Sequence, residues 1–184
     1  MKRGYAGTTT NHIAREAGVS IGSLYEYFGN KDEVIAALID RFADRGFSHA
    51  VRQAQLAMPM PPAEAVRFWL HGMVEFIAAD APLVRTLYQQ VPFVWELPRV
   101  QGMVSQVERL GLQFADMQGV RGPATRMQDR FYVIGVAIGA SIMQIATDPS
   151  TTARRRDLTD ELALMLVRYL KLGGERAITG AARP

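Results

Sequence analysis

The chain has 184 residues, of which 48% are hydrophobic, and it carries no cysteine and a net charge of +3. This composition supports a globular core and excludes a disulfide scaffold or a thiolate metal site, while the mild basicity permits a nucleic-acid partner without indicating one. The longest nearly uncharged stretch, residues 131–147, falls short of the length of a membrane-spanning helix, and the N-terminus does not resemble a signal peptide. We therefore interpret 131–147 as a buried helix and expect a cytoplasmic protein with no membrane partner.

Residues 9–28 have the pattern of two short helices joined by a tight turn. Threonines 8–10 can cap the first helix, Gly18 permits a left-handed turn after it, and Ser20 can cap the second helix. We expect an apolar seam between the two helices that consists of Ile13, Val19, Leu24 and Phe28. Val19 is expected to point inward. This spacing predicts a helix-turn-helix whose second helix is free to enter the major groove of DNA.

A third helix is expected to begin at Asn30, where Glu33 completes a capping-box arrangement, and to continue towards Val51. Its length predicts a strut that joins a head to a body. We place the head at residues 1–46 and the body at residues 47–184.

The apolar residues of the body recur at helical spacing, and no run alternates strictly as a strand would. The arginines at 154–156 are interpreted as a solvated loop before the last helix. Breaker residues separate the helices at 58–62, 81–82, 92, 119–123 and 148–150, and Gly173-Gly174 is expected to end the last one. The sequence therefore predicts an all-α fold of about eight helices, with a helix-turn-helix head, a connecting helix and a helical C-terminal body.

The sequence contains no pattern typical of an enzyme. Its three histidines, His12, His49 and His71, have no metal-ligand companion at helical spacing, and there is neither a glycine-rich phosphate loop with a lysine nor a nucleophile elbow. We therefore predict a protein that is not an enzyme and that has no metal and no cofactor.

A long pattern of fixed spacing runs through the head, namely Thr8-Thr9-Thr10-x-x-Ile13-Ala14-x-x-Ala17-Gly18-Val19-Ser20-x-Gly22-Ser23-Leu24-Tyr25-x-Tyr27-Phe28-x-x-Lys31-x-x-Val34. This pattern resembles the DNA-binding signature of the TetR (tetracycline-repressor) regulators over roughly residues 3–45, whereas the body agrees only in being helical and of the right length. In that family another helix precedes the helix-turn-helix. We expect this head to lack most of that helix, through a late start codon, a removed segment or genuine trimming, which would leave the undersides of Leu24 and Ile35 uncovered.

The resemblance implies a role for each matching residue of the head. DNA phosphates would be held by the hydroxyl groups of Thr10, Ser20, Tyr25 and Tyr27 and by the ammonium group of Lys31. The start of the second helix would face base edges with Ile21, Gly22 and Ser23, since a serine can bond to a base, an isoleucine can contact a thymine methyl, and a glycine lets the backbone approach. Alternatively, Tyr25 and Tyr27 are partly buried rings and Ser20 only caps its helix.

The resemblance also implies that the body dimerises and encloses an apolar effector pocket. The proposed dimer interface joins the glycines of the 131–147 stretch to the last helix and consists of Gly135, Gly139, Leu162, Met165 and Tyr169. The candidate pocket residues are aromatic or methionine side chains, namely Trp69, Met73, Phe76, Tyr88, Phe93, Trp95, Met103, Phe114 and Tyr132. His71, Glu75, Gln89 and Gln90 are the polar groups expected to orient a ligand. For both sets the alternative is ordinary packing within one chain.

These expectations combine into a dimeric DNA-binding transcriptional regulator that binds a near-palindromic operator in double-stranded DNA and is released by a small apolar effector of unknown identity. The sequence does not separate a repressor from an activator. The alternative is a helical protein-interaction module that has lost DNA binding.

Overall fold

The computed structural model describes residues 4–117, 119 and 124–172, and every regular element within these ranges is helical. The elements run in the order α1 (Thr10–Ala17), α2 (Ile21–Tyr27), α3 (Lys31–Ala57), α4 (Pro62–Ala79), α5 (Ala81–Gln90), the 3-10 helix η1 (Val94–Glu96), α6 (Pro98–Met117), α7 (Ala124–Thr147) and α8 (Thr152–Leu170). The predicted all-α class is confirmed.

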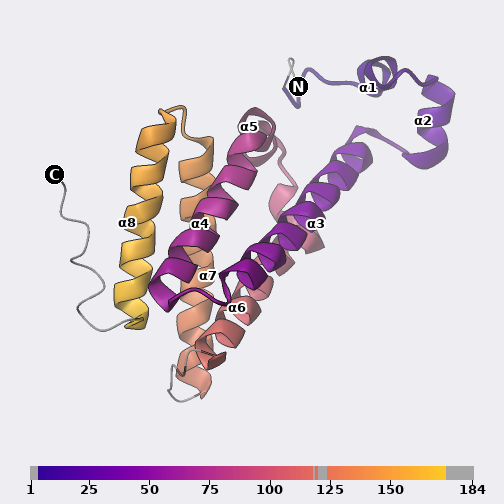
Figure 1. Cartoon of the computed structure of the whole chain (residues 1–184). Coiled ribbons are helices and arrows are strands. Elements are labelled where there is room, and N and C mark those ends of the chain that lie inside the picture. Colours follow the sequence, from indigo (N-terminus) through magenta and orange to yellow (C-terminus); the bar gives the residue numbers. More distant parts are fainter. Residues whose placement is uncertain (1–3, 118, 120–123, 173–184) are drawn as a thin grey trace.

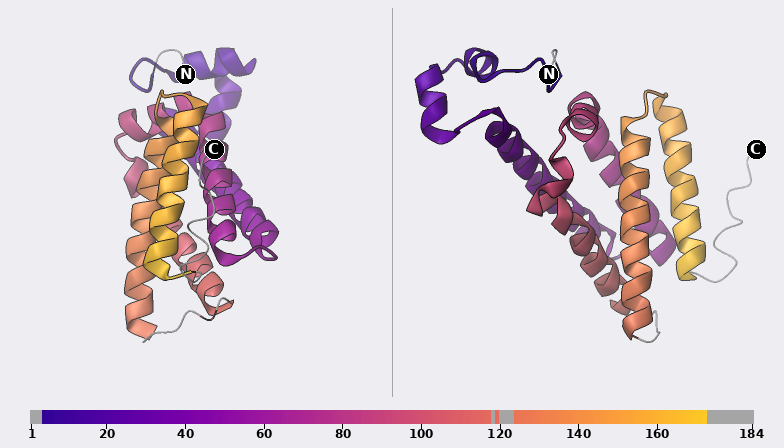
Figure 2. Two further views of the ribbon diagram at one scale, coloured as in Figure 1. Left: turned by 60° about the vertical axis from the view of Figure 1, so that its left-hand side comes forward. Right: turned by 180° about the vertical axis from the view of Figure 1, so that it is seen from behind.

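The body is a bundle in which α4 lies at the centre. It packs against α3 on one side and against α7 and α8 on another, while α6 packs against α7 and α3 (Figure 1). Leu70 and Val74 of α4 are fully buried, and they meet Phe131 of α7 and Leu166 of α8 in the main core. The two short helices of the head project away from this bundle on the end of α3 (Figure 2).

A second, smaller core joins the start of α3 to the α5–η1 segment. Ile35 and Ile39 of α3 pack there with Leu87, Val91 and Val94, and Tyr5 packs against the same cluster. The expectation that Leu24 and Ile35 would be uncovered was wrong, because Leu24 is 7% and Ile35 is 3% exposed. The physical reason for Ile35 is that the body itself, through α5 and η1, supplies the cover.

The connecting helix is longer than expected and is capped at Asn30 as predicted, but the reciprocal hydrogen bond of the capping box is displaced by one residue. Asn30 is the N-cap, and its Oδ1 accepts a 3.0 Å hydrogen bond from the Glu33 N–H. The Glu33 carboxylate, however, accepts from the N–H of Gly29 at 2.8 Å rather than from that of Asn30. The helix then continues to Ala57, beyond Val51.

Two boundaries of the last helix differ from the prediction. Residues 154–156 lie in the first turns of α8 and not in a loop, because Thr151 caps that helix by accepting from the Arg154 N–H. At the other end the helix stops at Leu170, where Lys171 adopts a left-handed conformation with φ 53°. Gly173-Gly174, expected to end the helix, lies outside the described residues.

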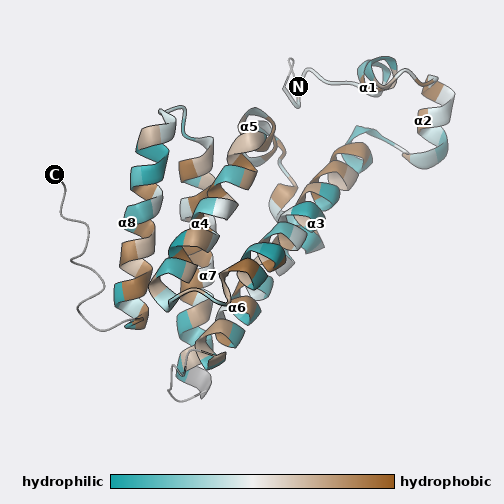
Figure 3. Ribbon diagram, viewed as in Figure 1, coloured by the Kyte–Doolittle hydropathy of each residue, from teal (hydrophilic) through white to brown (hydrophobic). Residues whose placement is uncertain are grey.

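The apolar helix α7 is buried on one side only. Tyr132, Val133 and Val136 are 57%, 59% and 46% exposed. By length and composition alone, Arg126–Thr147 is long and apolar enough to cross a membrane, and 33% of that window is buried within the chain. The stretch 131–147, predicted to be a buried helix, is therefore buried on one side only, and the helix that contains it is longer than the stretch because it begins before Phe131. Brown, hydrophobic segments are visible along α7 in Figure 3.

Candidate nucleic-acid interface and body cavity

The first helix of the head is fixed at both ends by short-range hydrogen bonds. The Thr9 hydroxyl accepts from the His12 N–H, and His12 Nδ1 accepts from the Thr9 N–H, each at 3.3 Å. At the other end Gly18 takes the left-handed conformation, with φ 70°, and its N–H reaches the last carbonyls of the helix. The predicted tight turn is confirmed, whereas the sequence interpretation did not find the reciprocal role of His12.

The second helix presents its first turn to solvent. Ser20 caps it by accepting a 2.9 Å hydrogen bond from the Ser23 N–H, and Leu24 is buried and anchors the inner side. Ile21, Gly22 and Ser23 are all exposed. Val19, expected to point inward, is 46% exposed, so that prediction was wrong. It lies in the turn between α1 and α2, where its N–H donates to the Ala14 carbonyl while its side chain stays at the surface.

The two head tyrosines are exposed rather than partly buried. Tyr25 is 52% and Tyr27 is 79% exposed, so the aromatic rings are not core residues. The Tyr25 hydroxyl lies 3.0 Å from the Thr10 hydroxyl, which links α2 to α1 and brings two predicted phosphate ligands together. Both hydroxyls remain at the surface, where each has capacity for a further hydrogen bond.

Lys31, the predicted cationic phosphate ligand, contacts the N-terminal segment. Its Nζ donates a 3.1 Å hydrogen bond to the Tyr5 carbonyl and lies 3.8 Å from the centre of the Tyr5 ring. The Tyr5 hydroxyl donates to Asp32 at 2.7 Å, and this hydrogen bond raises the pKa of Tyr5 above its usual value. The Tyr5 N–H also donates to Gln90 at the end of α5, so one residue ties the head to the body.

The body contains an apolar cavity of about 300 Å³. Helices α3, α4, α6, α7 and α8 enclose it. Trp69 and Phe114 are the two members of the predicted pocket set that line it. The indole N–H of Trp69 is already used, since it donates to the Ala50 carbonyl at 3.0 Å.

The remaining predicted pocket residues lie elsewhere, so placing them at one site was wrong. Met73 and Phe76 pack beside the main core, where Phe76 stacks on His49. Tyr88 and Trp95 form an exposed edge-to-face pair with ring centres 5.0 Å apart. Phe93 packs in the smaller core, whereas Met103 and Tyr132 are exposed. None of the four proposed polar orienting groups, His71, Glu75, Gln89 and Gln90, lines the cavity, and its own polar side chains are Gln55 and Gln113.

The residues predicted for a dimer interface divide between the core and the surface. Gly135 and Leu162 are buried within the chain, which corrects their assignment to an exposed interface. Gly139 is exposed, and Met165 and Tyr169 on α8 are 51% and 50% exposed. The exposed apolar side of α7 and α8, here called the α7–α8 face, consists of Tyr132, Val133, Val136, Gly139, Met165 and Tyr169.

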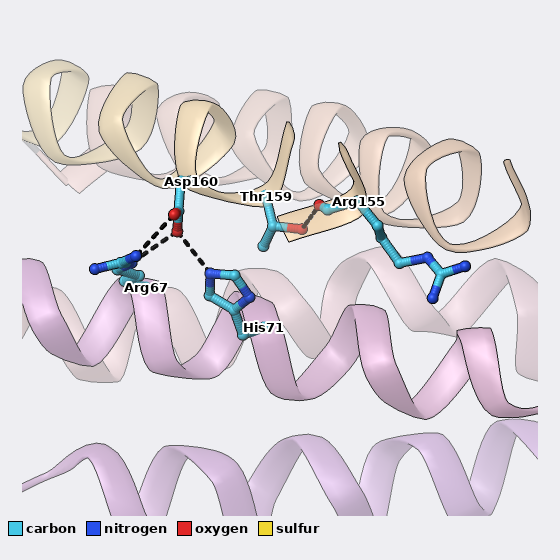
Figure 4. A network of polar contacts seen from close by, with 5 residues as sticks. All are labelled: Arg67, His71, Arg155, Thr159 and Asp160. Atoms are coloured by element: carbon cyan, nitrogen blue, oxygen red, sulfur yellow. Dashed lines mark hydrogen bonds and ion pairs between the residues drawn. The ribbon is translucent and has the colours of Figure 1, made fainter. Parts of the chain in front are cut away.

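A polar network that the sequence interpretation missed connects α4 to α8 (Figure 4). Asp160 of α8 accepts two hydrogen bonds from Arg67, each 2.7 Å long, and one of 2.6 Å from His71. Burial raises the pKa of Asp160, but the hydrogen bonds from Arg67 and His71 outweigh burial and hold the pKa below its usual value. Residues so far apart in sequence give no local signal for this contact. Within the described part of the chain, no group of three or more acidic, histidine or cysteine side chains is arranged to hold a metal ion.

One comparison with known proteins is confined to the head, and others extend over longer parts of the chain. A family model described as bacterial regulatory proteins of the tetR family matches residues 1–38. The chain is 30% identical over 121 residues to the nucleoid occlusion factor SlmA of Pasteurella multocida, covering 65% of this chain and 59% of that protein. It is 34% identical over 80 residues to the HTH-type transcriptional regulator TtgR of Pseudomonas putida, covering 44% of this chain and 38% of that protein.

A third relative is the HTH-type transcriptional repressor SCO4008 of Streptomyces coelicolor, which is 25% identical over 87 residues and matched over 47% of this chain and 41% of its own length. The matches thus span between 38% and 59% of the length of these curated relatives. The family-model match includes the helix-turn-helix, where the sequence pattern and the observed α1–turn–α2 geometry agree. The helix-turn-helix head, within residues 1–38, is of the tetR type found in bacterial regulatory proteins.

Proposed function

We propose that this protein is a cytoplasmic, DNA-binding transcriptional regulator that acts as a homodimer and is released from its operator by a small apolar effector. The observation that carries the proposal is the exposed first turn of α2, with Ile21, Gly22 and Ser23 at the surface, together with the exposed Tyr25 and Tyr27 on the same helix. Small and polar groups at a helix start suit contacts with base edges, and exposed hydroxyls suit phosphates.

Homodimerisation is supported by the α7–α8 face. Its exposed tyrosines, valines and methionine form an apolar surface on two adjacent helices, and such surfaces are typical of interfaces between protein chains. A two-fold dimer through this face presents two copies of α2, which suits a near-palindromic operator with half-sites about one helical turn apart or a multiple of it.

Effector control is supported by the course of α3. This helix begins at Lys31 beside the head and ends at Ala57, and its last turns line the cavity with Val51, Ala54, Gln55 and Ala57. Its 27 residues span roughly 40 Å. An effector that displaces the cavity end of such a rigid helix changes the separation of the two heads, and DNA must weaken effector binding by the same factor.

The test is fluorescence anisotropy of a labelled duplex taken from the region that flanks the protein's own gene, measured in a salt series. A regulator should bind with an affinity that falls steeply as salt rises, because several phosphates are neutralised. Tyr27→Phe removes an exposed hydroxyl and should weaken binding about fivefold for all sequences.

Ser23→Ala should instead reduce the preference for the operator over an unrelated duplex, since it removes a base-edge donor and acceptor. Met103→Gln, an exposed substitution on α6 and outside α1 and α2, serves as the control and should leave both properties unchanged. If no duplex, genomic or selected, is bound by the chain or by a version extended upstream to any earlier start codon, the DNA-binding proposal is wrong.

A further inference from the structure

The inner wall of the body cavity consists of hydrocarbon. Leu70, Ala65, Phe131 and Ile134 line it and are 0%, 2%, 3% and 6% exposed. The Trp69 indole N–H donates to a backbone carbonyl of α3 and is not available to a ligand. A polar ligand group placed against this wall would lose its hydration without a replacement hydrogen bond, so the inner part of a ligand must be apolar.

The other end of the cavity is open and carries its polar side chains. Met58 at the end of α3 and Met117 at the end of α6 are 59% and 57% exposed, and both also line the cavity. The carboxamides of Gln55 and Gln113 line it from the same two helices and are exposed. A carboxamide both donates and accepts hydrogen bonds but has no charge, so the mouth suits a polar, uncharged ligand head.

No charged side chain lines the cavity among the described residues. A carboxylate or an ammonium group at the mouth would therefore lose part of its hydration without gaining an opposite charge, which disfavours binding relative to an uncharged polar group. The volume of about 300 Å³ is twice that of the engineered apolar cavity of about 150 Å³ that binds benzene. A chain of about ten carbons or a fused pair of aromatic rings fits this volume.

We infer that the cavity ligand is an uncharged amphiphile, with a hydrocarbon or aromatic body against the inner wall and an uncharged polar head between Gln55 and Gln113. This inference rests on the effector role proposed above and names the chemical class of that effector. It requires that the charge of the ligand's polar group decides the affinity when the apolar part of the ligand is kept the same.

The experiment compares three linear ligands of ten carbon atoms each on the whole 184-residue chain. N-phenyl-1-naphthylamine, an uncharged fluorophore, reports occupancy of the cavity, and decanol, decanoate and decylammonium are titrated as competitors at neutral pH. Decanol should displace the fluorophore at a concentration about tenfold lower than either ion requires. Equal displacement by decanol and decanoate, or failure of the fluorophore to bind, overturns the inference.

Three variants test whether the fluorophore binds in this cavity and whether the charge at its mouth sets the ligand preference. Ala54→Leu fills part of the cavity and should weaken fluorophore binding about tenfold, whereas Ala37→Leu, on the exposed side of the same helix and away from the cavity, should not change it. Gln113→Arg places a cation at the exposed mouth and should improve displacement by decanoate about tenfold with decanol unchanged. If Ala54→Leu folds and binds normally, or if Gln113→Arg leaves decanoate unimproved, the inference is wrong.

These measurements contain no DNA, so they separate the ligand class from the proposed regulatory role. A protein that binds decanol selectively but binds no duplex contradicts the proposed function and leaves the ligand class intact. A protein that binds its operator but does not distinguish decanol from decanoate contradicts the ligand class alone.

Discussion

The Lys31 ammonium lies 3.8 Å from the centre of the Tyr5 ring and donates a hydrogen bond to the Tyr5 carbonyl. The same tyrosine bonds to Asp32 through its hydroxyl and to Gln90 through its N–H. A residue of the N-terminal segment thus joins the first turn of α3 to the end of α5. This contact fixes how the head-bearing end of α3 meets the body, and it holds the lysine that the sequence assigned to DNA phosphates.

The Tyr5 contact should contribute measurably to stability. Tyr5→Phe removes the bond to Asp32 but keeps the ring under Lys31, so the free energy of unfolding should fall by about 0.5–1 kcal/mol. Tyr5→Ala removes the ring as well and should lower it by about 2 kcal/mol. Urea denaturation measures both values. Tyr27→Ala, at a ring that is 79% exposed, is the control and should change stability by less than about 0.5 kcal/mol. Equal effects at the two tyrosines would contradict the contact.

The Arg67–Asp160–His71 network should make stability depend on acid pH. The folded pKa of Asp160 is lowered, so its stabilising effect is present above the unfolded pKa, near 4, and is lost as the pH falls through the folded value. Because the Asp160 side chain is 37% exposed, solvent screening limits this effect to about 1 kcal/mol.

Asp160→Asn should therefore be less stable than the wild type at neutral pH, and the difference should shrink below about pH 4. Urea denaturation across a pH series measures it. Glu161→Gln changes the exposed neighbouring carboxylate and should leave the pH profile as in the wild type. A constant difference between Asp160→Asn and the wild type at every pH would show that the carboxylate is not responsible.

Gly111 of α6 packs closely against Phe131 of α7. A Cβ atom added there would lie 2.5 Å from a ring carbon of Phe131, which is 3% exposed and has little room to move. Gly111→Ala should destabilise the protein by about 1–3 kcal/mol. Gly102, on the same helix, has no atom within 4 Å of an added Cβ, so Gly102→Ala should stabilise by about 0.5–1 kcal/mol. Thermal unfolding should therefore show a lower unfolding temperature for Gly111→Ala and a higher one for Gly102→Ala. A change of the same sign in both variants would be inconsistent with the α6–α7 packing.

The α7–α8 face should govern the proposed self-association. Val136 is 46% exposed on α7, so Val136→Glu can be accommodated by a folded single chain but would bury a charge in a dimer. We expect sedimentation equilibrium to give a dimer for the wild type and a monomer for this variant, with unchanged helicity by circular dichroism. Met103→Glu introduces the same charge on the exposed side of α6 and should remain dimeric. A wild-type monomer would contradict this role for the face.

The sequence determined the elements whose cause is local. The Thr9 and Ser20 caps and the left-handed Gly18 define α1, the turn and α2 within about twenty residues, and each depends on contacts between near neighbours. For the same reason the apolar spacing predicted an all-helical body. Because the matching residues of the head are so close in sequence, their fixed spacing was also enough to indicate the family.

The tertiary structure alone decided which side chains meet across helices. An aromatic residue at helical spacing faces inward in both a core and a pocket, so the pattern could not separate Trp69, which lines the cavity, from Phe76, which packs beside the core. Nor could it bring Asp160 to Arg67 and His71, or Lys31 to Tyr5, since these contacts depend on the rotation and crossing of helices. Val19 was misplaced for a related reason, because the turn geometry and not its hydrophobicity sets its exposure.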